Sequence, residues 1–265
     1  MNPLISIVIP VFNSGEFLPE TLNSVTNQTY SPIEVILVDN GSSETETIRL
    51  LNRLKDKYKV LDSGKTGVSN ARNLGINESK GEFILPLDSD DLLATNFVAL
   101  CLEAFNKDDS LSLVRTNIEL FGKKKGKMIF APYNFSTLLA RNLMVVSSMF
   151  KRSDWNETAG FDPIFKKGFE DWEFWINLLQ NGKKVHTIDK CLFKYRIRKG
   201  SRNHSLKNED FQEVRKLIWE KHKKLYSENF VLPTETFEYK LLEDSLALKI
   251  GSLILKPFES FKLLN

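Results

Sequence analysis

The sequence predicts an α/β fold with a doubly wound, mostly parallel sheet. In the first hundred residues, short apolar runs rich in β-branched side chains alternate with segments of helical periodicity, which is typical of such sheets. Polar, turn-forming clusters directly follow three of the apolar runs, at the sheet edge where ligands bind. The second half is less regular and predicts a small antiparallel part and a helical C-terminal extension.

The predicted strands of the first half are short and apolar. Residues 4–10 (LISIVIP) form a continuous β-branched run that ends at Pro10, and residues 33–40 (IEVILVDN) and 82–87 (EFILPL) repeat the pattern. A shorter strand is expected near residues 58–61. Runs without polar alternation are typical of strands covered on both faces, so these four strands are expected at the centre of the sheet.

Helices are expected between these strands, because apolar residues recur there at helical spacing. Leu18, Leu22 and Val25 repeat at i, i+4 and i+7, and residues 45–57 and 67–79 each carry an apolar stripe on a polar segment. The resulting β-α-β-α-β-α-β order predicts parallel strands with helices packed against them.

The second half predicts shorter elements of mixed type. They are two antiparallel strands around the turn at 122–127, a strand at 145–152, a helix that starts at Glu170 and stops at Gly182, two short strands within 184–197, and helices from about 206 onward.

Composition excludes several classes of protein. The chain has 265 residues, of which 42% are hydrophobic and 27% charged, an ordinary globular balance. A net charge of +3 gives no reason to expect a nucleic-acid partner. Cys101 and Cys191 supply neither a disulfide framework nor the spacing of zinc ligands. The N-terminus has no basic region before its apolar run, and no apolar stretch reaches about eighteen residues, so a cytoplasmic protein is expected.

Three carboxylates, Asp88, Asp90 and Asp91, follow the strand predicted at 82–87. Asp88 and Asp90 are expected on one side of an extended segment, where paired carboxylates suit a hard divalent cation that keeps positions open for phosphate oxygens. The alternative is that Asp90 or Asp91 caps a helix that begins near residues 92–95.

Two further polar residues lie near the same edge of the predicted sheet. Asp39 ends the second strand and could accept a hydrogen bond from a ring N–H or a ribose hydroxyl, although DNGSS is also good turn chemistry. Arg72 lies in a predicted helix, where a solvated surface role is the alternative to contacting a nucleobase carbonyl or a phosphate.

Glu170 and Asp171 begin an amphipathic helix. Capping and the helix dipole would explain them without any chemistry. The alternative is a general base, because an apolar wall of Phe169, Trp172 and Phe174 would raise the pKa of a neighbouring carboxyl.

Five segments in order resemble glycosyltransferase family 2, whose fold is called GT-A. They span roughly residues 4–198 and read PVFN after the first strand, then VILVDNGSS, GVSNARNLGI, GEFILPLDSDD and GFDPIFKKGFEDWEFWINLLQNG. The resemblance implies an inverting hexosyltransferase that uses Mn²⁺ or Mg²⁺ and a nucleotide-sugar donor, with a UDP-sugar favoured. It also implies a GT-A catalytic domain, expected over residues 1–205. The helical pattern that follows predicts a C-terminal extension over residues 206–265.

The resemblance assigns the donor-side roles by position. Pro10 and Val11 would line the nucleobase pocket, and Asp39 would contact the base with assistance from Arg72. Asn40 stands where the family often has a second aspartate, which bears on the base-side contacts.

The remaining implied roles concern the metal and the reaction. Asp88 would face the ribose or the sugar, and Asp90 would bind the metal that stabilises the leaving diphosphate. Asp171 would be the general base that takes the proton of the acceptor hydroxyl, with Glu170 beside it.

A basic loop at 195–204 (YRIRKGSRNH) is expected to cover the diphosphate, with a solvated loop as the alternative. The candidate phosphate contacts are Arg196, Arg198, Arg202 and His204. Trp172 and Trp175 are candidates for a platform on which the acceptor sugar stacks, and the alternative is that both belong to the core.

The C-terminal residues 244–265 mix many large apolar residues with lysines. This segment is too short and too charged to span a bilayer, but it could lie in a membrane interface. We expect a peripheral contact with the inner face of the cell membrane, where lipid-linked acceptors of cell-surface polysaccharide synthesis reside. Packing on the catalytic domain, or on a second subunit in a homodimer, is the alternative.

Other functions are less consistent with the motifs. No predicted strand is followed by GxGxxG or GxxxxGK[ST], which argues against dinucleotide enzymes and P-loop NTPases. A nucleotidylyltransferase would need a glycine-rich basic loop where PVFNSGEF stands. A non-catalytic nucleotide-sugar-binding or assembly module is the remaining alternative, and the presence of Asp88, Asp90 and Asp171 argues against it.

Overall fold

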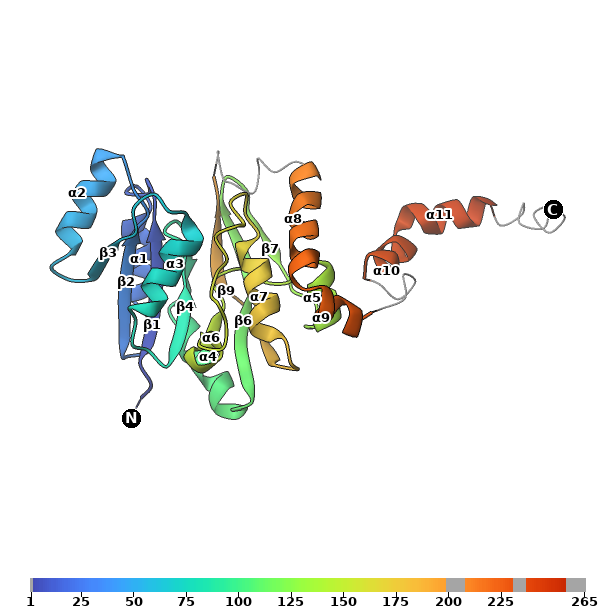
Figure 1. Ribbon diagram of the computed structural model, residues 1–265, viewed down its shortest axis with the longest axis horizontal. Helices are drawn as coiled ribbons and strands as arrows, with labels where there is room; N and C mark the ends of the chain where they lie inside the picture. The colour runs from blue at the N-terminus through green and yellow to red at the C-terminus, as the bar shows by residue number, and fades with distance from the viewer. Residues whose placement is uncertain (1, 199–207, 231–236, 256–265) are drawn as a thin grey trace.

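The computed structural model describes residues 2–198, 208–230 and 237–255. One mixed sheet runs through the body of the molecule, with helices on both faces, and the two C-terminal helices extend away from this body (Figure 1). The strand order within the described residues is β3-β2-β1-β4-β8-β6-β9-β5, with β7 paired to β6.

The first half of the chain forms the parallel part of the sheet, as predicted. Its strands are β1 (Ile5–Val11), β2 (Ile33–Asp39), β3 (Lys59–Asp62) and β4 (Phe83–Pro86). All of them pair in parallel, with β1 between β2 and β4. The carboxyl ends of these strands therefore meet at one edge, which collects the polar segments that follow them.

The second half adds the antiparallel pairs. Its strands are β5 (Leu92–Leu93), β6 (Leu111–Gly122), β7 (Gly126–Met128), β8 (Met149–Lys151) and β9 (Lys184–Ile197). β8 pairs antiparallel with both β4 and β6, so it joins the two halves into one sheet. β6 and β9 pair in parallel over most of their length.

Two predictions for the second half were wrong. The helix expected near residues 92–95 begins only at Phe97, because Leu92 and Leu93 pair with β9 instead. The segment 184–197 forms one long strand rather than two, because the twelve-residue β6 offers a continuous edge. The pairing of β6 with β9 shifts register on both sides of Asn117, which lets the strand continue past the polar residues there. The side-chain amide of Asn117 donates to Asp189 at 2.9 Å.

The helices divide between the two faces of the sheet. One face is covered by α1 (Leu18–Thr26), α2 (Thr45–Leu54) and α4 (Phe97–Lys107). The other is covered by α3 (Val68–Asn77), α5 (Phe135–Ala140), α6 (Arg152–Trp155), α7 (Glu170–Leu179) and α8 (Asn208–Lys221). Each face has its own apolar core, as expected for a sheet buried on both sides.

Helix α8, the first helix of the predicted C-terminal extension, packs on the globular body. Val214 and Ile218 are buried in the core on the α7 side of the sheet. The fully buried Glu173 carboxylate of α7 pairs with Lys221 Nζ and His222 Nε2, each at 2.9 Å. These contacts fasten the end of α8 to α7 and lead into the short helix α9 (Lys223–Glu228).

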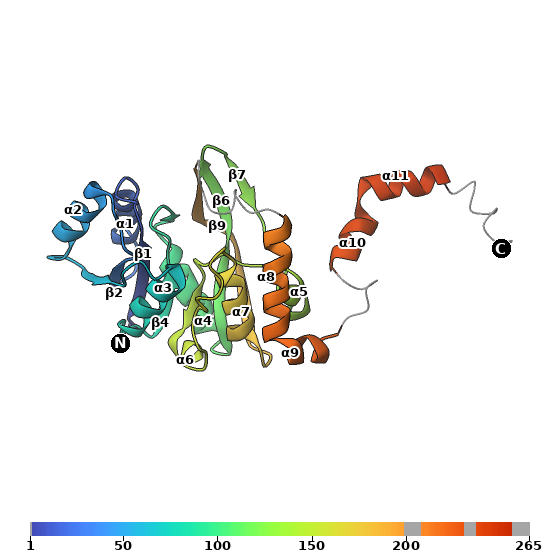
Figure 2. The ribbon, with the colours of Figure 1, turned by 45° about the horizontal axis from the view of Figure 1, so that its top comes forward.

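The last two helices lie outside the body. α10 (Phe237–Asp244) and α11 (Leu246–Leu255) extend away from it in both views (Figures 1 and 2). Within the described residues, no helix combines the length and the apolar character that crossing a bilayer requires.

Helix α3 lies unusually close to the parallel strands. A Cβ at Gly75 would come within 2.4 Å of the Val8 side chain and 2.9 Å of the Val38 side chain, so only glycine permits this approach. The close packing sets the depth at which Arg72, one helical turn before Gly75, enters the body.

Candidate functional site

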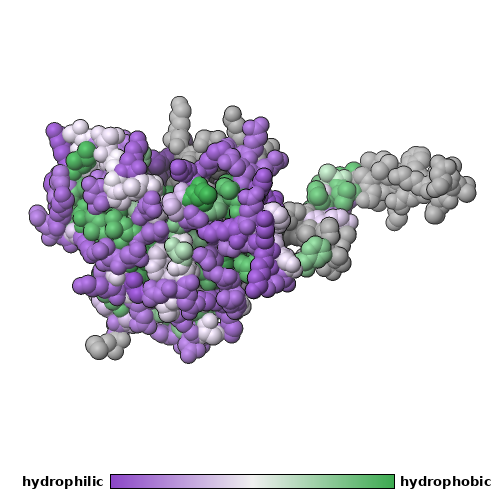
Figure 3. All heavy atoms as spheres, in the orientation of Figure 1, coloured by the Kyte–Doolittle hydropathy of each residue, from purple (hydrophilic) through white to green (hydrophobic). Residues whose placement is uncertain are grey.

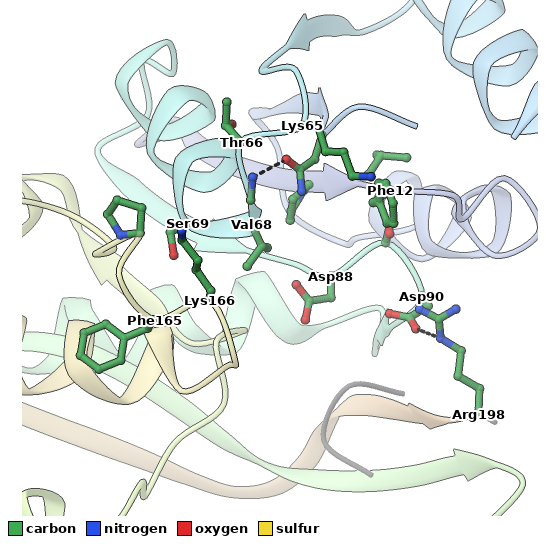
Figure 4. A pocket seen from close by; sticks show the side chains of 16 residues that line it. Phe12, Lys65, Thr66, Val68, Ser69, Asp88, Asp90, Phe165, Lys166 and Arg198 are labelled. Atoms are coloured by element: carbon green, nitrogen blue, oxygen red, sulfur yellow. Dashed lines mark hydrogen bonds and ion pairs between the residues drawn. The ribbon is translucent and has the colours of Figure 1, made fainter. Parts of the chain in front are cut away.

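A pocket of about 830 Å³ opens at the carboxyl edge of the parallel strands (Figure 4). Its walls come from separate parts of the chain: residues 10–12 at the end of β1, residues 65–69 at the start of α3, residues 88–90 after β4, Pro163, Phe165 and Lys166 before α7, and Arg198 after β9. The edge predicted from the strand order is therefore the place where the structure gathers polar side chains.

One end of the pocket combines an aromatic ring with hydrogen-bonding groups. Pro10 and Val11 line it, and the ring of Phe12 is 45% exposed beside them. Asn40 also lines it, and its side-chain oxygen accepts from the N–H of Gly67 at 3.0 Å. Asp39 does not line the pocket, because one of its carboxylate oxygens accepts from the N–H of Ser42 at 2.9 Å.

Arg72 lies beneath the pocket rather than in it. Its side chain is 2% exposed and donates to Asp88 at 2.7 Å and to Glu170 at 2.8 Å. Burial opposes the charge, but the two carboxylates outweigh it and raise the pKa of Arg72 further above its ordinary value. The guanidinium is thus bound inside the protein, contrary to the prediction that it assists the nucleobase.

Asp88 and Asp90 lie in a turn, not in the extended segment predicted, because the N–H of Asp91 donates to the carbonyl of Asp88 at 3.1 Å. The two carboxylates therefore have different partners: Asp88 bonds to Arg72, and Asp90 bonds to Arg198 at 2.6 Å. Burial and the neighbouring Asp88 raise the pKa of Asp90, and Arg198 opposes this.

Asp91 supports the turn and does not cap a helix. Its buried carboxylate accepts from the backbone N–H of Arg196 at 2.8 Å, and burial holds its pKa well above the usual range. Through this bond the turn after β4 is fixed to the end of β9.

Of the four predicted phosphate contacts, the structure describes Arg196 and Arg198, and these two have different surroundings. The Arg196 guanidinium donates to the Asp90 carbonyl at 2.7 Å, pairs with Glu20 and lies over the Phe121 ring, so it serves the fold. Arg198 lines the pocket. Arg202 and His204 lie outside the described residues.

The donor set of the pocket suits a divalent cation only in part. Among the described residues, no three His, Cys, Asp or Glu side chains gather as a metal site would require. Asp90 nevertheless presents a partly buried carboxylate, which in this structure forms an ion pair with the Arg198 guanidinium. Such a residue fits a single protein ligand whose metal takes its other oxygens from phosphate and water.

Asp171, the predicted general base, does not line the pocket itself. It accepts from the N–H of Trp172 at 2.8 Å and from the side chain of Asn142. Burial and the adjacent Glu170 raise its pKa to about 7, against the effect of Arg72. Glu170 is itself buried and bonded to Arg72, so its contribution is to position Arg72 and to bias Asp171.

The predicted aromatic platform was wrong. Trp172 and Trp175 are both 0% exposed, and the indole N–H of Trp172 donates to the Leu138 carbonyl at 2.6 Å. Neither ring has a free face on which a sugar could stack, since both side chains point into the core that α7 shares with α5.

Sequence reasoning missed several side chains of this site. Phe12 and Lys166 lie within PVFN and GFDPIFKKGF, but the sequence predicted no role for either. Lys65 follows a strand in a loop without a recognisable motif. Asn142 carries no local signal at all, because its loop comes close to Asp171 only through the packing of α5 against α7.

Comparison with known proteins gives one family match. The model of the family described as Glycosyl transferase family 2 matches residues 6–151. Chondroitin synthase of Pasteurella multocida (strain Pm70) is 30% identical over 219 residues, covering 80% of this chain and 22% of that protein. Chondroitin synthase of Escherichia coli is 31% identical over 222 residues, covering 80% of this chain and 31% of that protein. The chain thus spans less than a third of the length of these two relatives.

Solved structures share the fold. Staphylococcus aureus TarS, residues 1–349, matches with a TM-score of 0.61 in its complex with UDP and 0.63 in its complex with UDP-GlcNAc. Sequence identity is 21% in both cases, and the match covers 81% of this chain and 64–65% of TarS 1–349.

Removing the Arg72 charge should destabilise the fold. We expect Arg72→Met to lower the free energy of unfolding by about 3–5 kcal/mol, because Glu170 would stay buried without its cation. Urea denaturation at neutral pH measures the change. Arg49→Met is the matched control, since Arg49 is 68% exposed in a surface pair with Glu46 and should change stability by less than about 0.5 kcal/mol. A loss below about 1 kcal/mol for Arg72→Met would contradict this account.

Proposed function

The chain belongs to glycosyl transferase family 2, and we propose that it transfers a sugar from a nucleotide-sugar donor to a hydroxyl group of a saccharide acceptor. One observation carries the proposal: a single edge of the sheet brings together a pocket with an aromatic end, the Asp88–Asp90 turn with Arg198, and a carboxyl whose pKa is raised to about 7. Polysaccharide synthesis is the setting that the relatives' names suggest.

A UDP-sugar is the donor that the pocket and the comparisons favour. The TarS structures that share this fold were obtained in complex with UDP and with UDP-GlcNAc. In this chain the exposed ring of Phe12 and the polar groups of Asn40 and the loop at 65–67 suit a nucleobase and its ribose. Asp39 lies directly beside Asn40 and is the carboxylate that a modest shift of the turn would offer to the base.

The diphosphate would lie between this end of the pocket and Asp88. Asp90 would hold Mn²⁺ or Mg²⁺, which supplies Lewis-acid stabilisation of the leaving diphosphate. Arg198 reaches the same carboxylate from the opposite strand end, so its guanidinium is placed to donate to phosphate oxygens once Asp90 takes another cation. Asp88, turned toward Arg72, presents its remaining oxygen to the ribose or the sugar.

Asp171 would take the proton of the attacking acceptor hydroxyl. A carboxylate whose pKa is raised to about 7 is a far stronger base than an ordinary aspartate. The Trp172 N–H and the Asn142 side chain fix its orientation. Attack on the face opposite the leaving diphosphate would invert the anomeric carbon.

Replacing the proposed base tests the function. Asp171→Asn should reduce sugar transfer by at least a hundredfold, because the amide cannot accept the proton, while the affinity for UDP with Mn²⁺ stays within about threefold of wild type. Radiolabelled transfer and calorimetry measure the two quantities on the same preparation. Asp56→Asn, at an exposed position on the opposite side of the parallel strands, is the control and should keep full activity. Wild-type turnover in Asp171→Asn would refute the assignment.

Replacing the arginine partner of Asp90 tests the metal site. Arg198→Gln should strengthen Mn²⁺ binding without nucleotide by roughly two- to fivefold, because an ion pair partly open to solvent contributes up to about 1 kcal/mol. Electron paramagnetic resonance of free Mn²⁺ gives the affinity directly. Unchanged or weaker binding, relative to wild type and to Arg49→Gln, would show that Asp90 is not the metal ligand.

We also propose that residues 244–265 touch the inner face of the membrane, where a lipid-linked acceptor would reside. Leu242, Leu246, Leu248 and Ile250 are between 47% and 73% exposed on helices that leave the body (Figures 1 and 3). Apolar side chains that do not pack on their own chain suit an interfacial helix. Residues 256–265 of this segment lie outside the described part of the chain.

Flotation with vesicles of phosphatidylethanolamine and phosphatidylglycerol tests this contact. Leu246→Glu with Ile250→Glu, one helical turn apart, should at least halve the floated fraction, whereas Ile129→Glu, 64% exposed on the body, should not change it. If the double variant floats like wild type, the membrane contact is wrong. If it becomes monomeric in sedimentation while wild type is dimeric, the helices bind a second subunit instead.

A further inference from the structure

Two adjacent lysines in the loop before α7 have opposite surroundings. Lys167 lies between two carboxylates of α8, Asp210 and Glu213, and its Nζ is 2.8 Å from each. Lys166 lines the pocket instead, and within the described parts of the chain its ammonium has neither an ion-pair nor a hydrogen-bond partner. The charge of Lys167 is thus paired within the protein, whereas the charge of Lys166 faces the pocket.

The loop that carries Lys166 is firmly held. Phe161 and Phe165 are buried in the core on the α7 side, 0% and 3% exposed. Asp162 pairs with Lys221 of α8 at 2.6 Å, and its carbonyl accepts from Ser69 of α3 at 3.2 Å. The backbone beneath Lys166 is therefore fixed to both α3 and α8, so a ligand that binds the ammonium does not also have to order the loop.

The charged groups around the pocket divide into paired and unpaired ones. Asp90 is paired with Arg198, and Asp88 shares the guanidinium of Arg72 with Glu170. Among the described lining residues this leaves Lys65 and Lys166 as cations without a carboxylate partner. Two ammonium groups that line the cavity without a carboxylate partner suit anionic groups on the substrates, of which the nucleoside diphosphate is one.

The position of Lys166 separates it from the proposed diphosphate site. Lys65 lies beside Phe12, at the end proposed for the nucleobase, whereas Lys166 lies with Phe165 and Ser69, across Asp88 from Asp90 and Arg198 (Figure 4). A donor that places its diphosphate at Asp90 and its sugar at Asp88 would bring the sugar, or the acceptor beyond it, up to Lys166.

We propose that Lys166 binds a carboxylate or phosphate group at the sugar end of the pocket and so selects an acidic saccharide substrate. The inference rests on the proposed function and deepens it by naming a substrate class. The anionic group belongs either to the transferred sugar, as in a uronic acid, or to the acceptor, as in a uronate-containing or phosphodiester-linked glycan. An ammonium on a fixed loop recognises either group as a point charge.

Two matched pairs of ligands distinguish these sources. The donor pair is UDP-glucuronic acid and UDP-glucose, with affinities measured by calorimetry in Mn²⁺. The acceptor pairs are a chondroitin hexasaccharide with its carboxyl-reduced form, and a ribitol-phosphate oligomer with a neutral ribitol oligomer, measured in the presence of UDP and Mn²⁺. Wild type, Lys166→Gln and Lys167→Gln are compared, and UDP alone serves as the common reference.

Wild type should prefer the charged member of one pair by tenfold or more, and Lys166→Gln should reduce that preference to about threefold or less. Lys167→Gln should keep the preference, and all three proteins should bind UDP equally. The inference is overturned if no pair is discriminated, if Lys167→Gln behaves like Lys166→Gln, or if Lys166→Gln weakens UDP itself, which would make Lys166 a diphosphate contact. Failure of wild type to bind UDP at all would instead count against the proposed function.

Discussion

The guanidinium of Arg72 bonds at once to Asp88, which follows β4, and to Glu170, which begins α7. These two carboxylates come from the two halves of the chain and are far apart in the sequence. Burying two acids together would be very unfavourable without a cation between them. The position of the helix that carries the proposed base therefore depends on an arginine that does not line the pocket.

The same ion pairs set the electrostatics around them. Glu170 forms an ion pair with Arg72 and also raises the pKa of the adjacent Asp171, while Arg72 lowers that pKa. Arg72 thus stabilises the turn at Asp88 and keeps the pKa of Asp171 close to neutral pH, where a general base is most effective. The close packing of Gly75 on Val8 and Val38 is what brings Arg72 deep enough to do both.

A second set of contacts ties the pocket to the C-terminal part of the body. Asp91 and the Asp90 carbonyl bond to Arg196, which places Arg198 opposite Asp90. On the other side, Lys167 and Asp162 bond to α8, which holds the loop that presents Lys166. Helix α8 is consequently part of the site's support, although none of its described side chains (residues 209–221) lines the pocket.

The sequence alone determined the parallel half of the sheet, the edge where ligands would bind, and the family, because uninterrupted apolar runs and their trailing polar clusters are local signals. The same local signals predicted Asp88 and Asp90 as site residues, and the start of an amphipathic helix predicted Asp171. The roles of Arg72, Trp172 and Trp175 were decided only by tertiary packing, since burial depends on which helices meet and not on helical spacing. Lys166 and Lys167 are identical neighbours in the sequence. Only the fold distinguishes them, because α8 supplies carboxylates to one and the pocket leaves the other unpaired.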